Sequence, residues 1–222
     1  MTPLSWDLQL LNVCAALLLL LAFAMLSQRR IVTLVDLLAL QGAVLCVATV
    51  LVAWRTGKSH LYLSALLTLG LKVLFLPWLL RRLIRRLDVY WDTEPMANIG
   101  GTMLLGLLVV IFAFGLAQPI SALANTSTKS TIGVAVAVTL LAFLTMITRK
   151  KAMSQIVGFL SMENGLFFAA MSATYGMPMV VELGVALDVL VAMLVLGVFF
   201  FQIRERFETL DLHHFESLKE EK

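Results

Sequence analysis

The stretch LQLLNVCAALLLLLAFAML, residues 8–26, is almost uninterrupted in its apolar character and decides the class of fold. A helix needs about 20 mostly apolar residues to cross a bilayer core about 30 Å thick. The stretch is longer than the apolar segment of a signal peptide, and no basic residue precedes it. We therefore expect it to be retained as a membrane-spanning helix.

Runs of similar length and character recur along the chain. Of the 222 residues, 60% are hydrophobic and 14% are charged, whereas a soluble domain needs a larger charged fraction to coat its surface. We expect an all-α, polytopic membrane protein without a soluble domain or a nucleic-acid partner. Its seven predicted spanning helices cover residues 6–27, 31–54, 61–80, 99–118, 130–148, 152–174 and 178–203.

The basic residues indicate how the chain crosses the membrane. Alternate connections and the C-terminal tail hold 13 of the 17 lysines and arginines. Basic residues concentrate on the cytoplasmic side of membrane proteins, so the N-terminus is expected outside and the C-terminus in the cytoplasm. The connection at 81–95 is expected to form a short amphipathic helix on the headgroup layer. The tail, 204–222, would dock on a cytoplasmic partner or lie on the membrane.

Five ionisable side chains fall inside the predicted helices. An ionisable group at the centre of a membrane helix costs about 2.5–3.5 kcal/mol on insertion scales, so each one is a hypothesis of function. They are Asp36, Lys72, Glu163, Glu182 and Asp188.

Glu163 and Asp188 are the leading pair of carboxyl groups. At 1.5 Å per residue, Glu163 lies about 16 Å into its helix and Asp188 about 15 Å into the next. The two helices are consecutive, so the carboxyls are expected at similar depth. Burial disfavours the anion, which lets such a group hold or release a proton, as a proton relay requires. The alternative is a structural hydrogen bond between helices, and this alternative is favoured for Glu182, one turn from the helix end.

Asp36 and Lys72 form a second expected pair. An antiparallel hairpin would bring them within reach, as a neutralising pair or with Lys72 extending to the membrane surface, and Lys72 could also serve an ion pathway. Neither Cys14 nor Cys46 has a partner at the spacing of a metal or redox site. We therefore expect no cofactor, no metal and no catalytic residue.

Five segments resemble one known family. They are KVLFLPW (72–78), SMENGLFFAA (161–170), YGMP (175–178), ELGVALD (182–188) and FFFQI (199–203). Together they resemble hydrogenase-4 component E over most of the chain, most strongly from about residue 150 onward. That family is similar, in its last three helices, to the K subunit of respiratory complex I and the C subunit of Mrp-type antiporters. The resemblance implies an N-terminal four-helix region (1–125), a three-helix region (126–203) and a cytoplasmic tail (204–222).

The resemblance also implies a function and partners. In the K subunit, two glutamates on consecutive helices couple redox chemistry to proton movement, and Glu163 matches the first by position. Asp188 is the choice for the second, although it is an aspartate. The connection between the two helices is also shorter than in the K subunit, so Glu182 stays a competitor.

The expected protein is thus a non-catalytic subunit in a bacterial or archaeal cytoplasmic membrane. It would lie beside antiporter-like subunits and a complex I H-like subunit, in the membrane arm of a group 4 nickel–iron hydrogenase or formate hydrogenlyase-type complex. The hydrogenase module would dock on the cytoplasmic side. The function would be proton movement or its coupling, with sodium ions less favoured. The alternatives are a structural membrane anchor and a standalone ion transporter.

Overall fold

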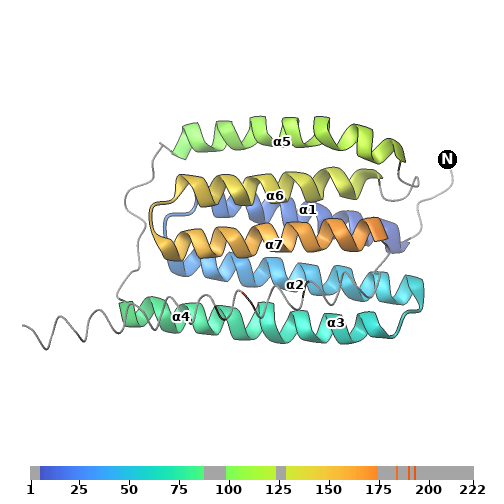
Figure 1. Cartoon of the computed structure of the whole chain (residues 1–222), viewed down its shortest axis with the longest axis horizontal. Coiled ribbons are helices and arrows are strands. Elements are labelled where there is room, and N and C mark those ends of the chain that lie inside the picture. Colours follow the sequence, from blue (N-terminus) through green and yellow to red (C-terminus); the bar gives the residue numbers. More distant parts are fainter. Residues whose placement is uncertain are drawn as a thin grey trace, which may run out of the picture. The chain divides into compact units, whose positions relative to one another are not determined.

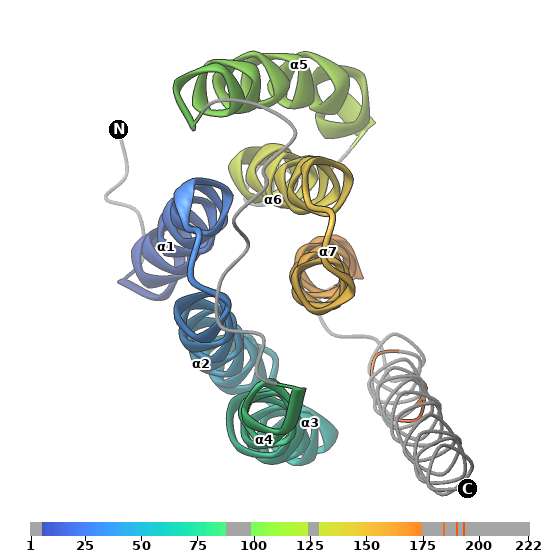
Figure 2. The same cartoon turned by 90° about the vertical axis from the view of Figure 1, so that its left-hand side faces the viewer.

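The structure is a computed structural model. It describes residues 6–87, 99–123 and 129–174, together with Gly184, Leu190 and Met193. The chain divides into two compact units, Met1–Asp188 and Val189–Lys222, and nearly all the described residues belong to the first. The helices of that unit are shown along their length in Figure 1 and nearly end-on in Figure 2.

The first unit is built from helices, whose bounds follow the apolar runs. They are α1 (Trp6–Ser27), α2 (Ile31–Thr56), α3 (His60–Thr68), the π-helix η1 (Leu69–Phe75), α4 (Leu76–Leu87), α5 (Ile99–Leu123), α6 (Lys129–Thr148) and α7 (Ala152–Thr174). Because α3, η1 and α4 follow one another without a break, the described residues contain six helices long and apolar enough to cross a membrane. The first six predicted spans are therefore confirmed as helices, and the seventh, 178–203, lies outside the described residues apart from Gly184, Leu190 and Met193.

Helix α2 lies between α1 and the helix formed by α3, η1 and α4. It packs against α1, α3, η1, α4 and α7, while α6 packs against α1, α5 and α7 (Figure 2). The core includes Leu18 of α1, Leu45 of α2, Leu141 of α6 and Phe168 of α7, all fully buried. One core therefore joins helices from both sides of residue 125, where the sequence predicts a boundary between two regions.

Glycines bring α6 and α7 close together. A Cβ atom added at Gly165 would lie 2.6 Å from Oγ1 of Thr139, and one added at Gly158 would lie 3.1 Å from the backbone nitrogen of Met146. Small residues at helix–helix contacts allow such close approach in membrane proteins, where packing replaces the hydrophobic effect as the source of association. Helix α7 is therefore held firmly on α6.

The third membrane-length helix does not end where the sequence predicts. A separate amphipathic helix is expected at 81–95. In the structure, residues 81–87 belong to α4, which continues α3 and η1 without a break (Figure 1). Leu83 and Ile84 are buried, and α4 packs against α2. The apolar face that suggested contact with lipid is thus used for contact with a neighbouring helix. Residues 88–95 lie outside the described part of the chain.

The basic connections gather at one end of the helices. The α1–α2 connection, the α6–α7 connection and the end of α4 lie there together (Figure 1). Arg149, which follows α6, is buried and donates from Nη2 to the carbonyl of Met25 at 3.3 Å, to that of Leu26 at 3.1 Å and to that of Gln28. Met25 and Leu26 lie in the last turn of α1 and Gln28 follows the helix, where backbone carbonyls lack intrahelical partners and a cation also suits the helix dipole. Arg149 therefore joins two connections that are far apart in sequence.

Candidate functional site

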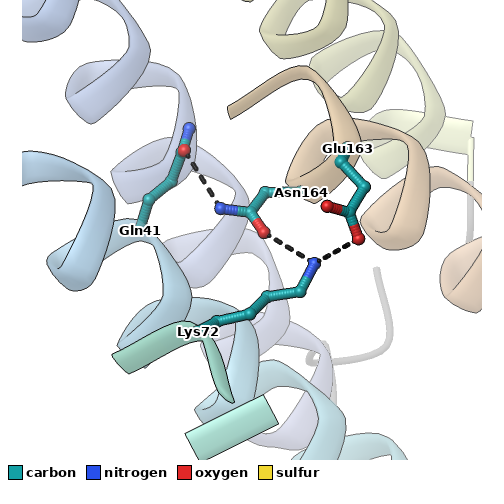
Figure 3. A network of polar contacts seen from close by, with 4 residues as sticks. All are labelled: Gln41, Lys72, Glu163 and Asn164. Atoms are coloured by element: carbon teal, nitrogen blue, oxygen red, sulfur yellow. Dashed lines mark hydrogen bonds and ion pairs between the residues drawn. The ribbon is translucent and has the colours of Figure 1, made fainter. Parts of the chain in front are cut away.

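Four polar side chains from three helical elements meet in the space between the helices (Figure 3). Nζ of Lys72, in η1, lies 2.9 Å from Oε1 of Glu163 and 2.9 Å from Oδ1 of Asn164, both in α7. Nδ2 of Asn164 donates to Oε1 of Gln41, in α2, at 3.3 Å. The residues are 0–4% exposed, so the whole group is shielded from solvent and lipid. We call Gln41, Lys72, Glu163 and Asn164 the buried polar cluster.

The π-helix gives Lys72 its position. In η1 the backbone is wound more widely than in an α-helix, and the N–H of Leu76 bonds to the carbonyl of Leu71, five residues earlier. A π-helical turn inserted in an α-helix is rare and occurs frequently at functional sites, because it changes the direction of the side chains on it. Here the turn bears a lysine that is 4% exposed and reaches α7.

Gly42 allows α2 and η1 to lie close at this level. A Cβ atom added at Gly42 would lie 3.1 Å from Cβ of Lys72 and 3.4 Å from its backbone carbonyl carbon and oxygen. Any larger residue would press on the backbone that carries Lys72. The pair Gln41–Gly42 thus supplies both a hydrogen-bonding side chain and the space that Lys72 needs.

The ring of Phe167 adds a further contact for the lysine. Phe167 is one helical turn after Glu163, and its ring centroid lies 5.5 Å from Nζ of Lys72. The face of an aromatic ring attracts a cation, more strongly where water is excluded. The ammonium of Lys72 is therefore held by a carboxylate, an amide oxygen and an aromatic ring.

The buried polar cluster lies near the middle of the membrane-length helices. Glu163 is about 16 Å from either end of α7 at 1.5 Å per residue. On the same basis Lys72 is about 18 Å from His60 and about 21 Å from Arg86, the ends of its own span. At this depth neither charge can reach the headgroup layer, so each depends on the other. Losing one partner of a buried pair typically costs about 3–5 kcal/mol.

The expected pair of Asp36 with Lys72 does not form. Asp36 instead accepts from Nη2 of Arg81 at 2.5 Å, and both side chains are about half exposed, at 47% and 46%. Gly42 is level with Lys72, and Asp36 lies six residues earlier in α2, about 9 Å nearer the basic end. Arg81 reaches that level and Lys72 does not. The structure therefore separates Asp36 from the buried cluster.

Glu182 and Asp188 lie outside the described residues, so their expected roles stay predictions. Gly184, between them in sequence, is described and lies against Phe167: an added Cβ atom would be 2.6 Å from Cδ2 and from Cε2 of that ring. The chain at Gly184 thus touches the same ring that Lys72 faces.

Two members of the site were not anticipated. Gln41 and Phe167 carry no charge, and neither was singled out as a site residue. A glutamine next to a glycine within an apolar span would have been a usable indication for Gln41. Asn164 was noted as a possible hydrogen-bonding neighbour, and the structure places it between Lys72 and Gln41.

Comparisons with known proteins extend the sequence argument. No family model and no solved structure matches the chain. The chain is 34% identical over 194 residues to the uncharacterized protein Rv0085 of Mycobacterium tuberculosis, covering 87% of this chain and 88% of that protein. It is 26% identical over 148 residues to hydrogenase-4 component E of Escherichia coli K12, covering 67% of this chain and 68% of that protein. The same figures hold for hydrogenase-4 component E of Shigella flexneri.

The expected resemblance to hydrogenase-4 component E is therefore confirmed as a distant similarity, and it fits a related multi-pass membrane subunit. Similarity to the complex I K subunit and to the Mrp antiporter C subunit stays a prediction. The mycobacterial protein is more similar to this chain, since the two are 34% identical along most of both chains. On that identity and coverage, the chain belongs to the same family as the uncharacterized protein Rv0085 of Mycobacterium tuberculosis.

Proposed function

We propose that this protein is a membrane-arm subunit of a hydrogenase-type complex, in which the pair of Lys72 and Glu163 takes part in proton movement or its coupling. Two observations support the proposal. One is the distant similarity to hydrogenase-4 component E. The other is a buried lysine–glutamate contact of 2.9 Å near the middle of the helices. The second observation carries the mechanism.

The pair can exist in two forms of equal total charge. As ions, Lys72 and Glu163 attract one another, which offsets the cost of removing both from water. Transfer of one proton from the ammonium to the carboxylate leaves a neutral amine beside a neutral acid. A proton that arrives from outside the pair leaves Glu163 neutral and Lys72 charged, so that the lysine depends more on Asn164 and Phe167. Buried ionisable residues that shift charge in this way are typical of proton relays in membranes.

The geometry favours protons over sodium ions. Oε1 of Glu163 and Oδ1 of Asn164 both accept from the same lysine ammonium. A sodium ion bound by these oxygens would have to displace Lys72 or lie beside its positive charge. The Lys72 ammonium therefore already occupies the position of a cation, and a proton needs no additional space.

The second carboxyl of the pathway is proposed to be Asp188. Gly184 lies against Phe167. Gly184 comes between Glu182 and Asp188 in sequence, and Glu182 stays the competitor for this role. Asp188 would then exchange a proton with the buried cluster.

The orientation is proposed from the distribution of basic residues, and the partners are proposed from the similarity to hydrogenase-4 component E. The basic end of the helices would face the cytoplasm, as in other membrane proteins with this bias of lysine and arginine. The proposed location of the protein is the cytoplasmic membrane of a bacterium or archaeon. Antiporter-like and complex I H-like subunits would lie beside the chain, and a nickel–iron hydrogenase module would dock on the basic side.

A structural role is the second candidate, and one observation favours it. The buried cluster joins η1 to α7, elements 91 residues apart in sequence at the ion pair. Such a contact can hold helices together without moving protons. A variant of Glu163 that keeps the size of the side chain but cannot bind or release a proton distinguishes the two roles.

The test is Glu163→Gln in the complete complex, in membranes of the host, with Asp36→Asn as the matched control. Each variant replaces a carboxylate by an amide, but Asp36 lies half exposed on Arg81. Assembly is checked by co-purification, and turnover and the ion gradient are then measured. The proposal expects Glu163→Gln to assemble and to lose the gradient, while Asp36→Asn keeps it. An assembled Glu163→Gln complex with an undiminished gradient would leave the structural role as the better account.

A further inference from the structure

A groove lies on the surface of the helix formed by α3, η1 and α4, away from the buried polar cluster. Its volume is about 570 Å³, within the usual range of about 300–1,000 Å³ for small-molecule sites. Its wall is mostly apolar and includes Gly70, Leu74, Phe75 and Trp78. Of these, Leu74, Phe75 and Trp78 are exposed hydrophobic side chains. The groove therefore accepts an apolar, flexible group.

Gly70 leaves the floor of the groove open. A Cβ atom added there would meet no other atom within 4 Å. Gly70 belongs to η1, as do Leu74 and Phe75, so the groove lies on the same π-helical turn that carries Lys72 on its buried side. The groove continues over the start of α4, where Pro77, Trp78, Arg81 and Arg85 line it.

Arginines surround one end of the groove. Arg81 and Arg85 line it directly. Arg81 is paired with Asp36, and Nε of Arg85 donates to the backbone carbonyl of Arg81 at 3.4 Å. The guanidinium of Arg82 lies 5.3 Å from the ring of Trp78. Asp36 is the carboxylate that the described part of the chain places in this group, so the end of the groove carries an excess of positive charge.

The depth of the arginines matches the headgroup layer. The span His60–Arg86 has 27 residues, which corresponds to about 40 Å of helix, longer than a hydrocarbon core of about 30 Å. The last two turns, with the arginines, therefore extend beyond the hydrocarbon. A tryptophan at the boundary, as Trp78 is here, is typical of the membrane interface. The apolar part of the groove lies on the hydrocarbon side of Trp78.

We propose that this groove binds one anionic diacyl phospholipid. An acyl chain lies in the apolar part over Gly70, and the phosphate lies beside Arg85, at the end of the groove that Arg81 and Arg85 line. The charge decides between this occupant and the apolar helix of a partner subunit, since an apolar helix offers nothing to the guanidinium groups. Basic pockets beside membrane helices bind anionic lipid headgroups in this way. The inference does not depend on whether the chain moves protons.

The test uses the full chain, purified in a nonionic detergent and stripped of lipid. Native mass spectrometry measures its affinity for dioleoyl phosphatidylglycerol and for dioleoyl phosphatidylcholine, which share acyl chains and differ in net charge. We expect tighter binding of phosphatidylglycerol, and a loss of about five-fold in Arg85→Gln, the effect of one arginine near an anionic headgroup. Arg29→Gln is the matched control, because Arg29 is an exposed arginine of the same end and is no part of the groove.

A second variant tests the acyl chain. Gly70→Leu adds a side chain where an added Cβ atom meets no other atom within 4 Å, so it is expected to fold and to weaken the binding of both lipids. Inorganic phosphate is expected not to displace phosphatidylglycerol, because it cannot use the groove. Equal affinity for the two lipids would overturn the proposal and leave the groove to a partner's apolar helix. Equal effects of Arg85→Gln and Arg29→Gln, displacement by phosphate, or unchanged binding in Gly70→Leu would each overturn it as well.

Discussion

Nζ of Lys72 lies 2.9 Å from Oε1 of Glu163, and the two residues come from helical elements that α2 also contacts. Both side chains are about 5% exposed or less. A lysine and a glutamate at this depth stabilise one another only while both are present. The relationship therefore links the stability of the helices to the proton content of the site, and the predictions below test each part of that link.

Removal of the lysine should destabilise the protein strongly. In Lys72→Met, Glu163 is left buried without its cation, and we expect a loss of about 3–5 kcal/mol in the free energy of unfolding. The control is Asp7→Asn, which breaks the ion pair of Asp7 with Arg55 at 36% exposure of each side chain and should cost about 1 kcal/mol or less. Denaturation in mixed micelles measures both.

Close packing at Gly42 should be as necessary as the charges. Gly42→Val places methyl groups against Cβ and the backbone of Lys72, and overpacking of this kind costs about 1–3 kcal/mol. Gly115→Val makes the same change in α5 where an added Cβ meets nothing within 4 Å. The difference in unfolding free energy between the two variants isolates the contact with Lys72. No difference would mean that α2 and η1 separate easily at this level.

Arg149 should hold the basic end together. Arg149→Met removes charged hydrogen bonds to carbonyls in the last turn of α1 and just after it, and each such bond contributes about 1.5–3 kcal/mol. We expect a loss of stability within or above this range, whereas Lys150→Met, at an exposed neighbouring position, should change it little. Equal thermal stability of the two variants in detergent would contradict the capping role.

Orientation can be measured directly. Cys14 and Cys46 are replaced by alanine, and a single cysteine is introduced at Lys151 or at Lys58, in connections at opposite ends of the helices. If the basic end faces the cytoplasm, an impermeant maleimide labels Lys151→Cys in inverted vesicles and Lys58→Cys in right-side-out vesicles. The reverse labelling pattern would show that the basic end of the helices faces away from the cytoplasm.

Much of the fold could be predicted from the sequence because it depends on local composition. The helix limits at 6–27 and 152–174 agree with α1 and α7, since long apolar runs in lipid satisfy their backbone groups only as helices. The continuation of the third helix to Leu87 was missed because Leu83 and Ile84 have an amphipathic pattern that fits contact with either lipid or α2.

The site was predicted in part. Glu163 and Lys72 stood out as buried charges in apolar helices, but the sequence paired Lys72 with Asp36, which the structure contradicts. The expected pair of Glu163 with Asp188 stays a prediction. The partner of a buried charge depends on which helices are neighbours and on how each is rotated. Here the π-helical turn sets the direction of Lys72, and Gly42 sets its distance from α2. Neither effect can be read from hydropathy, which treats all positions of a span alike.

The central claim is that Glu163 gains and loses a proton while the complex works. Infrared difference spectroscopy during turnover of the assembled complex measures this directly, because a protonated buried carboxyl has its own carbonyl stretching band. The account predicts a band that appears with turnover, is absent in Glu163→Gln and persists in Asp36→Asn. A working complex without any band that depends on Glu163 would contradict it.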